Sequence, residues 1–143
     1  MLLLALLLAL LAGCGKSAAE KQAESSSSGE GTVTCMGDAT SKSPGLPAGF
    51  PELDGLTYTN IEDKGPTHVV DGWSDESIAG LYTEFKDRLK EAQYKVLFAE
   101  LEQDRADSEV SYQSKDGKTE GIVALRASCD NGNVSFHITV RPA

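Results

Sequence analysis

The two histidines, His68 and His137, are the residues best suited to catalysis or metal binding in this chain. A hydrolase needs a histidine beside a nucleophile and an orienting carboxylate, and a zinc or copper site needs both histidines to meet further ligands. Neither histidine has a partner at i,i+4 spacing, and the chain contains no Gly-x-Ser-x-Gly, His-Glu-x-x-His or phosphate-binding glycine motif. We therefore expect surface histidines, no metal, no other cofactor and no enzymatic activity.

Acidic residues gather around one expected hairpin turn. They are Glu100, Glu102, Asp104, Asp107 and Glu109, with Arg105 as the base among them. Calcium binding is one interpretation, but the fixed ligand spacing of an EF-hand loop is missing. The other interpretation, a solvated turn that aids solubility, is the one we favour.

The N-terminus carries the most specific motif. Residues 1–12 are all apolar, which is too short for a membrane span but suits the hydrophobic region of a signal peptide. The following Leu11-Ala12-Gly13-Cys14 resembles the lipobox of bacterial prolipoproteins. That resemblance implies cleavage before Cys14 and acylation of this cysteine, with diacylglycerol on its sulfur and a fatty acid such as palmitate on its new amino group. The alternative is an ordinary secretory signal in which Cys14 is incidental.

This interpretation of the N-terminus predicts a chain in three parts. Residues 1–13 are the lipoprotein signal peptide, 14–47 the lipidated cysteine with a Ser-, Gly- and Pro-rich tether, and 48–143 a small domain. Several acyl chains hold a protein firmly on a bilayer, so we expect attachment to the cell membrane on its extracytoplasmic side. The resemblance to prolipoproteins also implies that Gly15, in place of Asp beside the cysteine, gives no inner-membrane retention signal, so the outer membrane is the alternative where a cell has one. The formal net charge of −9 argues against nucleic acid as a partner.

The remaining cysteines, Cys35 and Cys129, form an even pair in an oxidising compartment. We expect a disulfide between them, and a reactive thiol or metal ligand is the competing interpretation.

Hydrophobic periodicity predicts six strands and one helix. The helix has Ser74 as its expected N-cap and an apolar stripe of Ile78, Leu81, Tyr82, Phe85 and Leu89. The expected strands are 56–61, 67–73, 94–101, 108–114, 118–127 and 134–141. The run 94–101 is apolar on both faces, as in a central strand, and Trp73 is expected in the core. The order ββαββββ predicts an α+β fold, a two-layer antiparallel sheet of five to six strands with one helix on one face.

Several pieces of this domain resemble a type of small, largely uncharacterised bacterial lipoprotein module. They are Gly49-Phe50-Pro51, the helix stripe from Tyr82 to Leu89, Lys115-Asp116-Gly117-Lys118 and the terminal Val-x-Phe-x-Ile-x-Val. The resemblance covers about residues 48–143 and implies a fold but no catalytic residues.

One helix covers one face of a sheet and leaves the other to solvent or to a partner. His137, Thr139, Arg141 and Arg126 are expected on this second face, where the arginines could bind a carboxylate or phosphate. We predict a non-catalytic protein-interaction module of the cell envelope that contacts another envelope protein. The alternatives are a lipoprotein that binds a small ligand or metal ion and, as a weaker hypothesis, a hydrolase.

Overall fold

The computed structural model describes residues 37–102, 106–127 and 132–143. The chain divides into two units, Met1–Gly31 and Thr32–Ala143, and all described residues belong to the second. The expected signal peptide, Cys14, Cys35, Asp104, Arg105 and Cys129 lie outside the described residues. Within the described ranges, no helix has the length and apolar character needed to cross a membrane.

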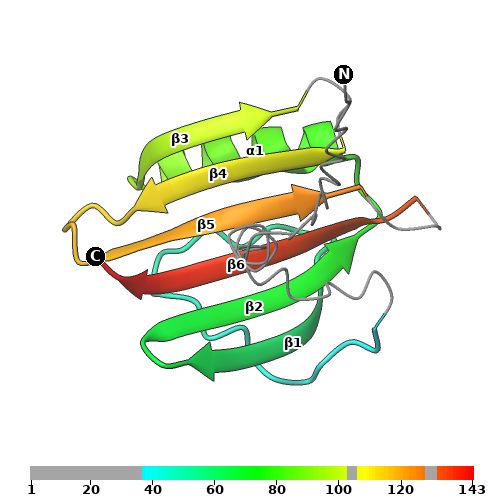
Figure 1. Cartoon of the computed structure of the whole chain (residues 1–143), viewed down its shortest axis with the longest axis horizontal. Coiled ribbons are helices and arrows are strands. Elements are labelled where there is room, and N and C mark those ends of the chain that lie inside the picture. Colours follow the sequence, from blue (N-terminus) through cyan, green and yellow to red (C-terminus); the bar gives the residue numbers. More distant parts are fainter. Residues whose placement is uncertain (1–36, 103–105, 128–131) are drawn as a thin grey trace, which may run out of the picture. The chain divides into compact units, whose positions relative to one another are not determined.

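The described residues form six strands and one helix in the order ββαββββ, which confirms the predicted α+β fold. The elements are β1 Thr57–Lys64, β2 Thr67–Ser74, α1 Ile78–Glu91, β3 Lys95–Leu101, β4 Asp107–Gln113, β5 Thr119–Arg126 and β6 Val134–Pro142. All neighbouring strands pair antiparallel, in the spatial order β1-β2-β6-β5-β4-β3. Figure 1 shows this order, with β3 and β1 at the two edges of the sheet.

The core lies between one face of the sheet and α1. Val70, Ile138, Val123 and Val110 are opposite one another across β2, β6, β5 and β4, and all four are completely buried. Burying each such side chain stabilises the fold by about 1.5–3 kcal/mol relative to its exposure.

The helix covers only part of this face. It contacts β3, β4 and β5, and Figure 1 shows it behind β3 and β4. Its buried side chains are Ile78, Leu81, Phe85 and Leu89, while Tyr82 is partly buried, so the predicted apolar stripe is confirmed. Leu46, Phe50, Leu53 and Leu56 from the segment before β1 complete the core.

The helix begins later than the sequence predicts. Ser74 was expected as the N-cap, but it is the last residue of β2 and is completely buried. Its hydroxyl accepts a hydrogen bond from the backbone N–H of Glu76 (3.2 Å), which turns the chain after the strand. Ser77 is the N-cap, and its hydroxyl accepts from the N–H of Gly80. Because serine suits both a turn and a cap, two serines three residues apart make the start ambiguous in the sequence.

The apolar run before the acidic turn is an edge strand and not the predicted central one. Among the described strands β3 pairs only with β4, and a β-bulge between Val96 and Phe98 interrupts this pairing. The bulge turns two consecutive side chains, Leu97 and Phe98, to the face away from the core, and each is 48% exposed. The two apolar faces of this strand therefore have different environments: one packs in the core, and the other is exposed.

Candidate functional site

The face of the sheet opposite α1, here called the open face, carries every predicted binding residue. Phe136, Ile138 and Val140 of β6 are buried toward the core, so alternation places Ser135, His137, Thr139 and Arg141 on the open face. Arg126 of β5 is opposite Ser135 and shares this face. Figure 1 is viewed onto the open face.

The two arginines do not form a common anion site. Arg126 is opposite Ser135 and Arg141 is opposite Glu120, at the two ends of the β5–β6 pair. Six residues of β6 separate these levels, or about 20 Å at the rise of a strand. Each arginine also faces a carboxylate. Arg141 donates from Nε and Nη2 to Oε1 of Glu120 (3.1 and 2.8 Å), and Nε of Arg126 lies 3.3 Å from Oδ1 of Asp107.

His137 belongs to a hydrogen-bonded group that the sequence did not reveal. Its Nδ1 lies 2.6 Å from Oδ1 of Asp71, which is directly opposite on β2, and Asn60 donates to the other carboxylate oxygen (3.2 Å). Partial burial acts to raise the pKa of Asp71, but the hydrogen bonds from His137 and Asn60 outweigh it, so this pKa lies below its usual value. Asn60 and Asp71 are paired in the β1–β2 hairpin, whereas His137 lies 66 residues after Asp71, and the β2–β6 register brings it to them.

A histidine held by a carboxylate resembles two members of a catalytic triad, but no nucleophile completes it among the described residues. The nearest hydroxyls along β6 are those of Ser135 and Thr139. The Ser135 hydroxyl donates to the carbonyl of Arg126, and Oγ1 of Thr139 accepts from the N–H of Ile122. Neither hydroxyl has a hydrogen bond to His137, which a nucleophile activated by this histidine requires.

The two histidines lie on opposite faces of the sheet and cannot share a metal ion. His68 follows the core-facing side of β2 with Val70, whereas Asp71 and His137 are on the open face. No group of three or more His, Cys, Asp or Glu side chains suited to a metal occurs in the part of the chain that the structure describes.

Among the described residues, the exposed large apolar side chains of the open face lie on β3 and β5. Leu97, Phe98 and Ile122, here called the apolar patch, are 48%, 48% and 36% exposed. Phe98 is opposite Ser111, which in turn is opposite Ile122, so the patch residues lie in one row on the open face with Ser111 of β4 between them. A shallow hollow of about 430 Å³ adjoins it, lined by Leu97, Ile122 and the Glu120–Arg141 ion pair, among others. By contrast, Val69 and Ser135 of the β2–β6 half are buried.

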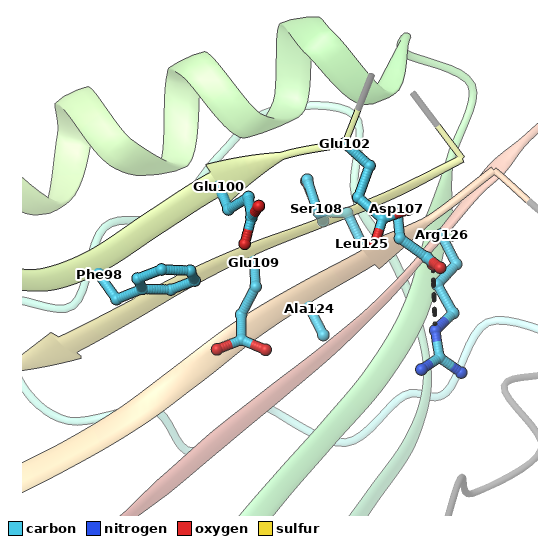
Figure 2. Close-up of a pocket in the computed structure, with 9 residues that line it drawn as sticks. All are labelled: Phe98, Glu100, Glu102, Asp107, Ser108, Glu109, Ala124, Leu125 and Arg126. Atoms are coloured by element: carbon cyan, nitrogen blue, oxygen red, sulfur yellow. Dashed lines mark ion pairs between the residues drawn. The ribbon is translucent and has the colours of Figure 1, made fainter. Parts of the chain in front are cut away.

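A second hollow, of about 220 Å³, lies at the acidic end of the same surface. Figure 2 shows Phe98, Glu100 and Glu109 on the side of β3 and β4 away from α1, with the Arg126–Asp107 ion pair at the far end. Glu100 and Glu109 are directly opposite one another. Like charges at directly opposed positions destabilise a sheet, so this pair of glutamates does not stabilise the described fold.

Sequence reasoning missed the apolar patch because it placed 94–101 in the centre of the sheet. It also placed Trp73 in the core, whereas the structure has this residue half-buried on the open face. The indole N–H of Trp73 donates to the carbonyl of Gly37 (3.4 Å). The period-2 pattern of 67–74 gives no clear signal here, because Trp73 alternates with Val69 on one face and Ser74 with Val70 on the other.

Comparisons of the chain with protein-family models, curated proteins and solved structures find no match.

Proposed function

We propose that this chain is a lipid-anchored lipoprotein of the cell envelope whose sheet domain is a non-catalytic protein-interaction module. The lipobox-like Leu11-Ala12-Gly13-Cys14 supports the anchor, and the apolar patch supports the interaction. The anchor would attach the protein to a membrane through Cys14, on the extracytoplasmic side.

The apolar patch is the observation on which the interaction proposal rests. Large apolar side chains that share one exposed surface mark contact sites more often than isolated ones do. The surrounding residues are charged or polar, with Glu100 and Glu109 on one side and Glu120 and Arg141 on the other. An apolar centre with a polar rim is the usual anatomy of a protein–protein interface.

The hollows support a macromolecular partner better than a small ligand. A ligand pocket usually encloses most of its ligand. Here both hollows lie on one face of a sheet, and their lining side chains come from adjacent strands. Such a surface suits a broad contact with another protein.

Photo-crosslinking of the anchored, full-length chain in its native envelope tests this proposal. A photoreactive residue replaces Ile122 in the patch or, as a control, the exposed Lys90 on α1. We expect Ile122 to capture one defined protein and Lys90 to capture none. Equal, diffuse labelling from both positions contradicts an interaction module.

The Cys14→Ala variant tests the anchor separately. We expect the wild-type chain to carry acyl groups by mass spectrometry and to sediment with membranes, and the variant to lose both properties. A variant that keeps its acyl groups excludes Cys14 as the lipidation site.

A further inference from the structure

The two edges of the sheet differ in how they are covered. At the β1 edge, the N–H of Thr40 donates to the carbonyl of Tyr58 (2.7 Å), so the preceding segment lies along the strand. At the β3 edge, no backbone hydrogen bond from the described ranges reaches the outer side of the strand. An uncovered edge strand presents unpaired N–H and C=O groups to any strand that can align with it.

The exposure pattern of β3 is symmetric. From Lys95 to Glu100 the side chains are exposed, partly buried, exposed, exposed, partly buried and exposed. The bulge causes this symmetry, because it places Leu97 and Phe98 on the same face. The pattern reads the same in both directions about the midpoint between these two residues.

An antiparallel pair requires that opposed side chains lie on the same face of the sheet. A second copy of β3, related by a two-fold axis through the Leu97–Phe98 midpoint, meets this requirement at every position. The axis places Leu97 opposite Phe98 and Val96 opposite Ala99 of the second copy. A shift of one residue sets exposed side chains opposite partly buried ones and fails.

The same axis also pairs opposite charges. It sets Lys95 of each copy directly opposite Glu100 of the other, so two Lys–Glu pairs flank the apolar centre. Neither side chain has a hydrogen bond or ion pair with another described residue. The ammonium of Lys95 would also offset the repulsion between Glu100 and Glu109, which no described residue compensates.

We propose that two copies of this chain associate through β3, in antiparallel register about the Leu97–Phe98 midpoint, to form one continuous sheet. This inference rests on the proposed function as an interaction module and names the partner at the β3 edge. A bulge normally protects an edge, because its backbone spacing does not fit a regular strand. Two identical bulges related by the two-fold axis face one another and restore the match.

Charge exchange between differently tagged copies tests both the association and its register. Two full-length chains with different C-terminal tags are co-expressed, dispersed in detergent and purified through one tag. Wild-type copies should co-purify. Lys95→Glu in both copies, or Glu100→Lys in both, replaces two attractive pairs by two repulsive ones, and we expect co-purification to fall about tenfold.

The decisive sample combines one Lys95→Glu copy with one Glu100→Lys copy. In this register all charge pairs are attractive again, so co-purification should return to about the wild-type level. Asp87→Lys and Lys90→Glu, at exposed positions of α1, are the matched charge reversals and should have no effect.

Each other result overturns the inference. If wild-type copies do not co-purify, the second copy is not the partner, and capture of a different protein from Ile122 would still support an interaction module. If copies associate but the mixed pair does not recover, the β3 register is wrong. If the α1 reversals have the same effect as those in β3, the association does not depend on this edge.

Discussion

His68 joins the segment before β1 to the β1–β2 hairpin through both of its ring nitrogens. Nδ1 lies 2.7 Å from Oδ1 of Asp63, and Nε2 lies 2.7 Å from the carbonyl oxygen of Pro44. Both partners accept hydrogen bonds, and only a protonated imidazole can donate from both nitrogens. The hydrogen bond to Asp63 and then that to Pro44 raise the pKa of His68 above its usual value of 6.5, against the opposing effect of partial burial.

Because the pKa of His68 is raised in the folded state, the contribution of its two hydrogen bonds to stability depends on pH. It is fully present below the unfolded pKa and is lost as pH rises through the higher, folded pKa. We predict that urea unfolding between about pH 5.5 and about pH 8.5 shows a difference between wild type and His68→Gln that shrinks with rising pH. A difference that is constant over this range would show that His68 contributes only by packing.

Tyr112 and Gly121 form a second close contact, in which a single added atom would change the packing. Tyr112 of β4 is completely buried, and its hydroxyl donates to the carbonyl of Thr139 on β6 (2.7 Å), across the intervening β5. Burial raises the pKa of Tyr112. A Cβ at Gly121 of β5 would lie 1.8 Å from that carbonyl oxygen and 2.6 Å from the Tyr112 hydroxyl, so only glycine fits.

This geometry predicts unequal costs for two small substitutions. Tyr112→Phe leaves the Thr139 carbonyl without its hydroxyl donor and should lower the free energy of unfolding by about 1–2 kcal/mol. Gly121→Ala forces strands apart and should cost about 3 kcal/mol. The double variant should not recover stability, because the clash with the backbone oxygen remains. Urea denaturation measures all three, and a tolerated Gly121→Ala would contradict the close approach.

At the scale of elements, Ser77 is the cap that α1 requires. Its hydroxyl accepts the N–H of Gly80 (3.1 Å), which would otherwise have no partner at the helix start. Ser77→Ala should lower the free energy of unfolding by about 1 kcal/mol. The exposed Ser41→Ala should have no measurable effect in the same urea titration. Equal stability of the Ser77 and Ser41 variants would place the cap elsewhere.

The elements show what periodicity predicts and where it fails. The stripe from Ile78 to Leu89 and the alternation in 134–141 each reflect one buried face, and a buried face leaves a clear period in the sequence. The edge position of β3 leaves no such mark, because it depends on which strands pair. The Asp71–His137 pair was unpredictable for the same reason, since 66 residues separate the two along the chain.

At the scale of the whole molecule, the described residues bear on the predicted disulfide between Cys35 and Cys129, which themselves lie outside the described ranges. The Gly37 carbonyl accepts from Trp73, which is opposite Ser135 on β6, and Ser135 is opposite Arg126. Gly37 and Arg126, which are two and three residues from the cysteines in the sequence, therefore lie at the same end of the sheet.

A bridge here would close a long loop that contains most of the domain, so its loss should be costly. We predict that the Cys14→Ala variant, denatured and unreduced, shows no free thiol in a thiol assay, and that reduction releases two. Cys35→Ser should lower the free energy of unfolding by about 2–4 kcal/mol. Cys129→Ser should have the same effect, and the double variant should be no less stable than either single variant, because one bond is lost in all three. Free thiols before reduction, or additive losses in the double variant, would show that the two cysteines act separately.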